Sequence, residues 1–351
     1  MIIKAQVLRN FYASLLRAVG TSSEDAEITS DALIDADLHG LETHGALRIP
    51  PYIRIAREGV LDASGKPALE WRKGAVSLIN GNNGWGQPAA FMAVNEVISH
   101  AKTHFVGAAG IKNTNHIGTC SYYAKMLARA GLVGFVTTNS PPNMPPWGGS
   151  EPILGTNPIC FSAPTPDGKV IVIDMATSVV AKGKILLAAE RGESIPEGWA
   201  LDKNGKPTTS PKEALEGSQL PVGGPKGYGL ALFAEIFSGV LTGANIGTNL
   251  HSMYDKILNP SGVGAFMFAI DISPFGIEQV NAKMEQLIGM VLGSELAEGY
   301  QRIYLPGENS SEIAEERKVK GIPMSPSILE KMNQVAQELG INPLKPDEGG
   351  A

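Results

Sequence analysis

Cysteine is nearly absent from this chain of 351 residues, which contains only Cys120 and Cys160. Two thiols are too few for a disulfide framework or a four-thiolate zinc site, so both of those protein classes are excluded. No other cluster of metal ligands stands out, and we expect no metal. A chain that needs no disulfide is typical of a reducing compartment, and we expect the protein to be cytoplasmic.

An excess of positive charge is also missing. Lys and Arg number 29 and Asp and Glu number 35, which gives a formal net charge of −6. Because binding to a nucleic acid needs a surplus of cations to neutralise phosphates, we expect no nucleic-acid partner.

Long apolar runs are missing as well. A long uncharged run, residues 130–150, contains four prolines and four glycines, and it would leave backbone groups unsatisfied in lipid. The N-terminus lacks the apolar stretch and cleavage site of a signal peptide, so we expect neither export nor a membrane partner. The 43% hydrophobic and 18% charged fractions are instead typical of a packed globular protein of about two domains.

Apolar periodicity predicts a chain that is helical at both ends and alternates in the middle. Expected helices near the ends cover residues 7–19, 22–40, 277–292, 310–320 and 326–339. The middle alternates expected strands at 76–79, 106–111 and 132–138 with expected helices at 87–104 and 119–130. This alternation predicts an α/β fold.

Two further strands, residues 157–163 and 169–174, are separated by a Pro-Asp-Gly turn that predicts a hairpin, so the sheet is expected to be mixed. We expect a helical lobe from residues 1–74 plus 296–351 and an α/β domain from 75–295. Residues 192–225 are rich in Gly, Pro, Ser and Thr, which predicts an ordered surface excursion or lid.

A dinucleotide-binding fingerprint is matched at residues 84–89, Gly-Trp-Gly-Gln-Pro-Ala, after a strand and before a helix. A true site also needs an acidic residue about 20 positions further on, to hold a ribose hydroxyl. Residues 106–112 contain none, which favours a glycine turn that feeds a helix over a Rossmann site.

The segment 223–229, Gly-Gly-Pro-Lys-Gly-Tyr-Gly, precedes an apolar helix. Free backbone N–H groups, a helix dipole and the Lys226 ammonium there would suit a phosphate. No Lys-Ser or Lys-Thr closes the loop, so it is not an ATP-binding Walker loop. A surface lysine at a glycine-rich helix start is the alternative.

Two histidines lie in glycine-flanked segments that present side chains, His44 before Gly45 and His116 two residues before Gly118. An imidazole is suited to proton transfer near neutral pH, although a hydrogen-bonded structural role is common. Arg48 and Tyr52 follow His44 by four and eight residues, so on a helical segment all three would point the same way. An arginine there would hold a carboxylate substrate, or would simply be a surface salt-bridging residue.

His100 and His104 stand four apart on one helical face. This spacing could bind a metal, but no carboxylate or thiolate supports it, and we interpret the pair as part of a solvated face.

Taken together, these segments resemble the malate/L-lactate dehydrogenase type 2 family over nearly the whole chain. The family includes ureidoglycolate, sulfolactate and malate dehydrogenases and piperideine-carboxylate reductase. The segments that carry the resemblance are His39 to Gly45 with Arg48, Asn115 to Gly118, Gly155 to Pro158, Asp174 to Ser178, Ile195 to Trp199 and Gly224 to Gly229.

The resemblance implies a non-Rossmann nicotinamide-binding fold, with a mixed, largely antiparallel sheet, a helical lobe from both chain ends, and a homodimer. It also implies site roles by position. The cofactor would contact Ser140, Asp174, Met175, Ala176, Lys226, Gly307 and Glu308. The catalytic residues would be His116, His44 and Asp174, with Arg48 and Tyr52 binding the substrate.

The implied activity is hydride transfer between NAD(P) and C2 of a small 2-hydroxy or 2-oxo acid, of the malate, lactate, sulfolactate or ureidoglycolate type. Either histidine would exchange the hydroxyl proton. Reduction of a cyclic imine such as a pyrroline or piperideine carboxylate is one alternative, and a non-catalytic cofactor-binding protein is another.

NAD is the expected cofactor, with NADP possible. No arginine cluster accompanies Ser140 or the segment after Asp174, and a 2′-phosphate normally needs such a partner. Lys182 and Lys184 would supply one if they face the adenosine ribose; otherwise they are solvated lysines on a helix.

Overall fold

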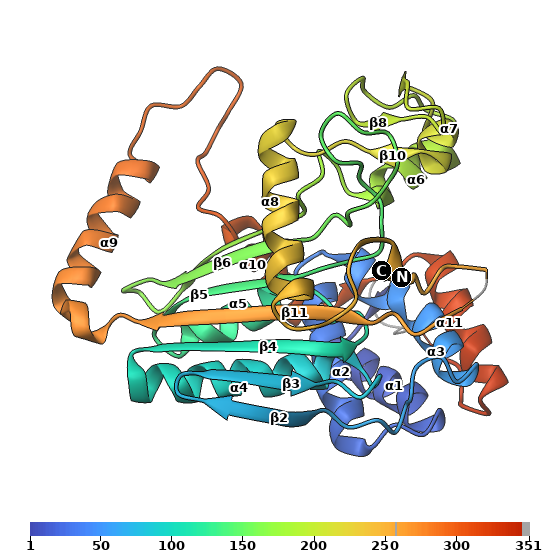
Figure 1. The fold of residues 1–351 in the computed structure, drawn as a ribbon, viewed down its shortest axis with the longest axis horizontal. Helices are drawn as coiled ribbons and strands as arrows, with labels where there is room; N and C mark the ends of the chain where they lie inside the picture. Colours follow the sequence, from blue (N-terminus) through green and yellow to red (C-terminus); the bar gives the residue numbers. More distant parts are fainter. Residues whose placement is uncertain (257, 346–351) are drawn as a thin grey trace.

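A seven-stranded mixed sheet forms the centre of the molecule (Figure 1). The computed structural model describes residues 1–256 and 258–345. The strand order is β2-β3-β4-β11-β5-β6-β7; β3 and β4 are parallel and the other neighbours are antiparallel. The expected mixed, largely antiparallel sheet is therefore confirmed. The strands are β2 (Ala68–Lys73), β3 (Val76–Asn80), β4 (Val106–Thr114), β11 (Val263–Asp271), β5 (Leu132–Thr138), β6 (Ile159–Pro164) and β7 (Val170–Met175).

The predicted hairpin is confirmed at the sheet edge, where β6 and β7 pair antiparallel from Ile159 with Met175 to Pro164 with Val170. The turn is held by the Asp167 carboxylate, which accepts the Thr165 hydroxyl. Gly168 follows with φ +78°, a conformation that a side chain would strain. β7 is the last strand in the sheet order, so no further described strand pairs with its outer side.

Helices cover the two faces of the sheet differently. One face packs against α4 (Gly86–His104) and α5 (Cys120–Arg129) through small and aliphatic side chains such as Val97, Leu127 and Met267. The other face meets α8 (Pro225–Glu235) and the π-helical turn Ile236–Val240 that extends it, through an aromatic cluster around Phe135. This second cover is narrower, so part of that face stays exposed.

The interpretation of His100 as part of a solvated face is wrong. The residue is buried, and its Nε2 lies 2.8 Å from the Ser77 hydroxyl. Gly107 of β4 explains the error, because its missing side chain lets α4 approach the sheet, and a Cβ there would lie 2.9 Å from the His100 Cβ. His100 is thereby turned toward β3 and β4, whereas His104, the last residue of α4, is exposed as expected.

Helices from the two ends of the chain pack side by side at one end of the molecule (Figure 1). Their shared core joins residues such as Leu8, Leu15 and Ile53 to Leu329 and Met332. The elements are α1 (Ala5–Ala18), α2 (Ser23–Leu38), α3 (Ile49–Arg57) and α11 (Pro326–Glu338), with the short pair β1 (Ile2–Ile3) and β12 (Ile322–Pro323). The division at residues 74 and 296 remains a proposal, and β2 belongs to the sheet although it precedes residue 74.

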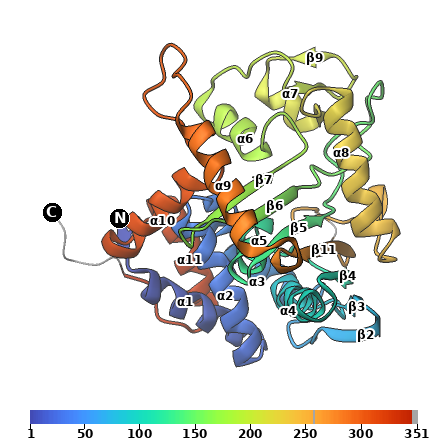
Figure 2. The same cartoon turned by 90° about the vertical axis from the view of Figure 1, so that its left-hand side faces the viewer.

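The expected surface excursion is a small lobe with its own core, which includes Ile185, Ile195 and Ala200. It begins before residue 192, because α6 packs onto α7. Its elements are α6 (Lys182–Arg191), β8 (Ala200–Leu201), β9 (Pro207–Thr208), α7 (Pro211–Glu216) and β10 (Ser218–Gln219). Figure 2 shows this lobe above β6 and β7.

Helix α9 (Ile277–Leu292) stands away from the sheet as an arm and contributes no buried residue (Figures 1 and 2). A long loop leads from it to α10 (Glu308–Lys320), which returns to α2. Among the described helices none has the length and apolarity needed to cross a lipid bilayer.

Candidate active site

The segment that carries His44 and Arg48 consists of two short 3₁₀ turns, Glu42–His44 and Ala46–Arg48, followed by α3. The expected single helical face for His44, Arg48 and Tyr52 is therefore wrong. The α-helix begins only at Ile49, because prolines 50 and 51 lack N–H groups and fit only its first turn. Tertiary packing, rather than helical spacing, brings His44 and Tyr52 together.

A buried carboxylate beneath this segment fixes its course. Asp37 accepts the Ala46 N–H at 3.0 Å through Oδ1 and the Tyr12 hydroxyl at 2.9 Å through Oδ2. A Cβ at Gly45 would lie 1.9 Å from Asp37 Oδ1, so the close approach requires glycine. Burial raises the pKa of Asp37 to about 7. No sequence pattern pointed to Asp37, which lies inside α2.

The two candidate histidines face each other, with ring centroids 5.5 Å apart. Thr43 Oγ1 lies 3.0 Å from His44 Nδ1, and the Tyr52 hydroxyl lies 2.6 Å from His116 Nδ1. Burial, with the nearby charge of Arg48, lowers the pKa of His44 to about 3 and that of His116 well below its usual value. Both rings are therefore neutral at physiological pH, a state in which they can accept or exchange a proton.

Tyr52, which contacts His116, is itself held by a second buried residue. Gln87, the second residue of α4, donates from Nε2 to the Tyr52 hydroxyl at 2.9 Å. Burial raises the pKa of Tyr52 to about 12, so its hydroxyl is protonated in the resting site. Sequence reasoning assigned Tyr52 to the substrate and read Gln87 only as part of a glycine turn, because the contact joins residues 35 apart.

Arg48 is placed to receive an anion. Its Nη1 donates to the Tyr254 hydroxyl at 3.0 Å and lies 3.8 Å from Met253 Sδ. Its Nε is buried without a partner, and no carboxylate forms an ion pair with it in the described parts of the chain. The expected alternative, a salt-bridging arginine, thus has no partner among those residues. Tyr254 and Met253 were missed because they lie about 200 residues away.

The small lobe reaches this site through the start of α6. A Cβ at Gly183 would lie 3.3 Å from the Thr43 methyl group, next to His44. Lys182 Nζ donates to the Asn143 side chain at 3.1 Å, and burial lowers the pKa of Lys182. The lobe therefore lies against the catalytic segment.

The residues that the resemblance assigned to the cofactor gather around the end of β7. Asp174 lies on this strand, and its Oδ2 accepts the Ser121 N–H at 2.8 Å, at the first turn of α5. Met175 ends the strand and is exposed. No hydrogen bond joins Asp174 to either His44 or His116 in the described residues, so it is placed with the cofactor group rather than with the imidazoles.

Backbone hydrogen bonds tie three other segments to this strand end. Val172 donates to Pro306 O at 3.1 Å, which brings Gly307 alongside β7. Thr177, which follows Ala176, donates to Thr156 O, and Val222 donates to Thr177 O, both at 2.9 Å. The Ser140 and Lys226 segments therefore meet β7 at one place.

Ser140 is fixed by a buried amide. Its N–H donates at 3.0 Å to Asn157 Oδ1, while Asn157 Nδ2 donates to Glu235 Oε2 at 2.6 Å. A Cβ at Gly155 would fall 2.1 Å from Ser140 O, so glycine is required for the approach. The loop after β5 is thereby anchored to α8.

Lys226 is exposed in the first turn of α8, after Gly224 and Pro225. Gly224 has φ +64°, and a Cβ there would meet the Trp147 ring at 3.0 Å. The turn thus presents free N–H groups and an ammonium together. These groups suit the pyrophosphate of a dinucleotide.

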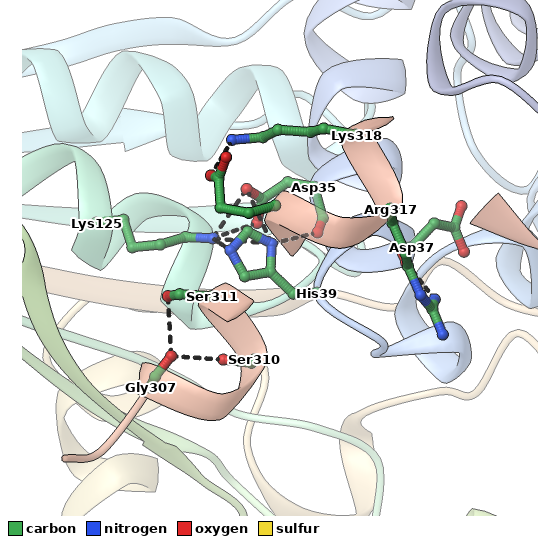
Figure 3. A network of polar contacts seen from close by, with 10 residues as sticks. Asp35, Asp37, His39, Lys125, Gly307, Ser310, Ser311, Arg317 and Lys318 are labelled. Atoms are coloured by element: carbon green, nitrogen blue, oxygen red, sulfur yellow. Dashed lines mark hydrogen bonds and ion pairs between the residues drawn. The ribbon is translucent and has the colours of Figure 1, made fainter. Parts of the chain in front are cut away.

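Gly307 and Glu308 lie at the start of α10, and a polar network around α2 joins that helix to α10 and to α5 (Figure 3). Lys125 is nearly fully buried, and its Nζ lies 2.7 Å from Asp35 Oδ2 and 3.0 Å from His39 Nε2. The Arg317 guanidinium donates to Asp37 O at 2.6 Å. These contacts join α5 and α10 to α2, the helix whose Asp37 holds the segment that carries His44.

Together these groups fit a nicotinamide dinucleotide. The outer edge of β7 has no strand partner in the sheet beyond the Val172 contact with Pro306 O, and α8 offers a cationic helix start. Gly307 approaches β7 so closely that a Cβ would lie 3.2 Å from Val172 O. Ser140, Asp174 to Ala176, Lys226 and Gly307 would hold the cofactor. Among the described residues, no group of three or more His, Cys, Asp or Glu side chains is placed to bind a metal.

Comparison with known sequences places this site among dehydrogenases. The family model described as malate/L-lactate dehydrogenase matches residues 3–333. The malate/(S)-sulfolactate dehydrogenase of Methanothermus fervidus is 38% identical over 97% of this chain and 99% of its own. The (2R)-3-sulfolactate dehydrogenase (NADP(+)) of Chromohalobacter salexigens is 38% identical over 78% of this chain and 83% of its own. The ureidoglycolate dehydrogenase (NAD(+)) of Escherichia coli is 33% identical over 92% of each chain.

Comparison with solved structures gives the same result. The sulfolactate dehydrogenase of Methanocaldococcus jannaschii superposes with a TM-score of 0.90 at 37% identity, covering 97% of this chain and 98% of its own. The delta1-piperideine-2-carboxylate reductase of Pseudomonas syringae pvar. tomato superposes with a TM-score of 0.85 at 28% identity, covering 96% and 100%. The non-Rossmann fold expected from the sequence is therefore confirmed.

Proposed function

Since the chain belongs to the malate/L-lactate dehydrogenase family, we propose that its histidine site interconverts a small 2-hydroxy acid and the corresponding 2-oxo acid. The protein is an oxidoreductase of the 2-hydroxyacid dehydrogenase class, and a nicotinamide cofactor supplies or accepts the hydride. The observation that carries the site assignment is the guanidinium of Arg48, unpaired by any described carboxylate, beside two neutral histidines whose rings are 5.5 Å apart.

In the proposed mechanism Arg48 holds the substrate carboxylate, because a guanidinium binds a carboxylate with two parallel hydrogen bonds. His116 then exchanges the proton on the substrate oxygen, since its Nδ1 is occupied by Tyr52 and its Nε2 is left for the substrate. His44 lies across from it and orients the same oxygen. We assign Tyr52 to His116 rather than to the substrate, because its hydroxyl already contacts His116 and Gln87.

A panel of acids tests this function through the absorbance of the reduced cofactor. We expect turnover with at least one of malate, sulfolactate, lactate or ureidoglycolate, and His116→Ala should lower kcat by about 10²- to 10⁴-fold, the usual contribution of a positioned acid/base. A His116→Ala variant within a few-fold of the wild type would move the acid/base role to His44. Arg48→Lys should raise KM for the acid, because an ammonium cannot reproduce the bidentate contact.

A second candidate is reduction of a cyclic imine, favoured by the similarity to the piperideine-carboxylate reductase. The same arginine would hold the carboxylate, with the imine nitrogen in place of the oxygen. Including a pyrroline and a piperideine carboxylate in the panel separates the two reactions. Turnover of the imine alone would replace the hydroxy-acid assignment.

For the cofactor we propose NAD rather than NADP. At the start of α10 the Arg302 guanidinium is paired with both Glu308 and Glu312, so no free arginine is offered there to a 2′-phosphate. Lys182 is engaged by Asn143. The test is kcat/KM with each cofactor in the wild type and in Lys184→Ala. A preference for NADPH that disappears in this variant would reverse the assignment.

We further propose that the enzyme is a homodimer in the cytoplasm. The arm α9 has no buried residue, and it exposes apolar side chains such as Ile277, Leu287 and Met290. The same chain leaves Phe161 and Ile173 exposed on the α8 face of the sheet. Two uncovered apolar surfaces on one chain are the arrangement expected of reciprocal contacts between copies. Both cysteines are buried free thiols, as suits a reducing compartment.

A further inference from the structure

We propose that Gln87 and Tyr52 are positioning residues that keep the proton of neutral His116 on Nε2, the ring nitrogen available to the substrate. The proposal deepens the proposed function and rests on it, because it concerns the histidine assigned to proton exchange. It is carried by a chain of three contacts, each of which restricts the next.

The first contact is from the backbone. The Gly118 N–H lies 3.3 Å from His116 Nδ1 and donates to it. A backbone N–H can only donate, so Nδ1 must present its lone pair. The ring proton of neutral His116 is therefore on Nε2, which makes no hydrogen bond to any residue that the structure describes.

The second contact follows from the first. The Tyr52 hydroxyl lies 2.6 Å from the same Nδ1, and it must donate there because Nδ1 carries no proton. The Tyr52 oxygen then has only lone pairs left, so any further hydrogen-bond partner of this oxygen must be a donor. Gln87 meets this requirement by presenting Nε2, at 2.9 Å, to the Tyr52 oxygen.

This arrangement leaves the other polar atom of the Gln87 amide, Oε1, in an unfavourable state. Gln87 is 0% exposed, and its Oε1 has no hydrogen-bond partner. A buried amide oxygen without a partner is unfavourable, and an apolar side chain of similar shape would avoid it. The residue is thus poorly explained by stability, and well explained by the hydrogen bond that it gives Tyr52.

The arrangement also balances the proton transfer. When C2 of the 2-oxo acid gains the hydride, the substrate oxygen takes the Nε2 proton, and Nδ1 takes the Tyr52 hydroxyl proton, so the ring stays neutral. The Tyr52 oxygen, now negative, keeps the Gln87 N–H. After product release, Nε2 takes up one proton from solvent, the proton that reduction of a 2-oxo acid consumes, and Nδ1 returns its proton to Tyr52. Oxidation of the hydroxy acid follows the same steps in reverse.

The tautomer can be read without substrate or cofactor, from the ¹⁵N chemical shifts of histidine side chains in the free protein at neutral pH. The His116 signals are identified by their loss in His116→Asn. We expect a protonated Nε2 and an unprotonated Nδ1 in the wild type. Tyr52→Phe and Gln87→Met should shift the ring toward a mixture of tautomers.

Activity and stability are measured as well, and the two are expected to change in different directions. Tyr52→Phe should lower kcat about 10- to 100-fold, and Gln87→Met about tenfold, with KM for the cofactor unchanged, because both act through the acid/base. The Tm of Gln87→Met should be equal to or above that of the wild type, since the unpartnered oxygen is removed. A residue with only a structural role would lose activity together with stability.

Gln219 provides a matched control. It is also a buried glutamine whose Oε1 has no partner, and its Nε2 donates to Val180 O. Gln219→Met should leave the His116 shifts and kcat unchanged. A wild-type ring protonated on Nδ1, or a Gln87→Met variant with wild-type shifts and kcat, would overturn the proposal. Inactivity toward every acid tested would count against the proposed function alone, because the shifts are measured without substrate.

Discussion

At the scale of single residues, the candidate site depends on buried groups that hold His44 and His116 in place. His44 and His116 are neutral because burial and Arg48 disfavour their charged forms. His44 gains its position from a segment that Asp37 holds through the Ala46 N–H. Residues of this kind carry no sequence signature, since an aspartate within a helix is ordinary.

Asp37 leads to a prediction about pH and stability. Burial raises its pKa from 3.8 to about 7, so in this interval the folded protein binds a proton that the unfolded chain does not. Its contribution to stability is therefore present at low pH and is lost as pH rises, by at most about 1.4 kcal/mol per pH unit. Asp37→Asn imitates the protonated acid and cannot titrate.

The measurement is the Tm of the wild type minus that of Asp37→Asn between about pH 4 and about pH 7. The difference should fall as pH rises. Other carboxylates titrate in both proteins and cancel in the difference. A difference that is constant across the interval would mean that Asp37 stays ionised. Gly45→Ala, which places a Cβ against the same carboxylate, should lower activity at every pH.

At the scale of elements, helix starts and strand ends assemble the cofactor region. The end of β7, the start of α8 and the start of α10 are joined by backbone hydrogen bonds from Val172 and Val222. Each element alone offers only unsatisfied backbone groups, which are common. Their convergence is what provides a strand edge, a cationic helix start and a close-packed glycine for one ligand.

Lys226 at the start of α8 tests this assembly. Lys226→Ala should raise KM for the nicotinamide cofactor about tenfold or more, because a hydrogen bond to a charged group contributes about 1.5 to 3 kcal/mol. KM for the acid should change little. Initial rates with each ligand varied in turn give both constants.

Helix α7 offers the control, because it also begins with a Pro-Lys pair and its Lys212 is exposed. Lys212→Ala should leave both constants unchanged. Equal effects of the two substitutions would show a general charge effect rather than a contact at α8.

At the scale of the whole molecule, the arm α9 is the feature that a single chain leaves unexplained. Among the described elements its main contacts are with the short turn Ser273–Phe275, and Met290 is 63% exposed. An amphipathic helix of this length would normally bury one face. We therefore expect the arm to contact a second copy of the chain.

Introducing charge on the apolar face should release the monomer. Leu287→Glu combined with Met290→Glu is expected to halve the mass measured by light scattering during size-exclusion chromatography, because burying unpaired carboxylates is unfavourable. Lys283→Glu, a charge change at a polar position of the same helix, should leave the dimer intact. A wild-type protein that elutes as a monomer would contradict the assembly.

The sequence by itself determined much of the local structure and the general chemistry. Periodicity and local backbone geometry depend on neighbours in the chain, so they predicted the alternating strands and helices and the turn at Gly168. The lack of an acidic residue after Gly84 was read directly from the sequence. Histidines beside glycines and the lysine at a helix start were identifiable for the same reason, and the set of segments pointed to the family.

Only the tertiary structure decided which side chains act together. Hydrogen bonds join Gln87 at the start of α4 to Tyr52 of α3, and Tyr52 to His116. A loop about 200 residues away contacts Arg48. Tertiary packing also buries His100, which the sequence pattern had placed on a solvated helix face. Such contacts depend on how elements dock, a choice made by summed packing and burial across the whole chain, so no local stretch of sequence specifies them.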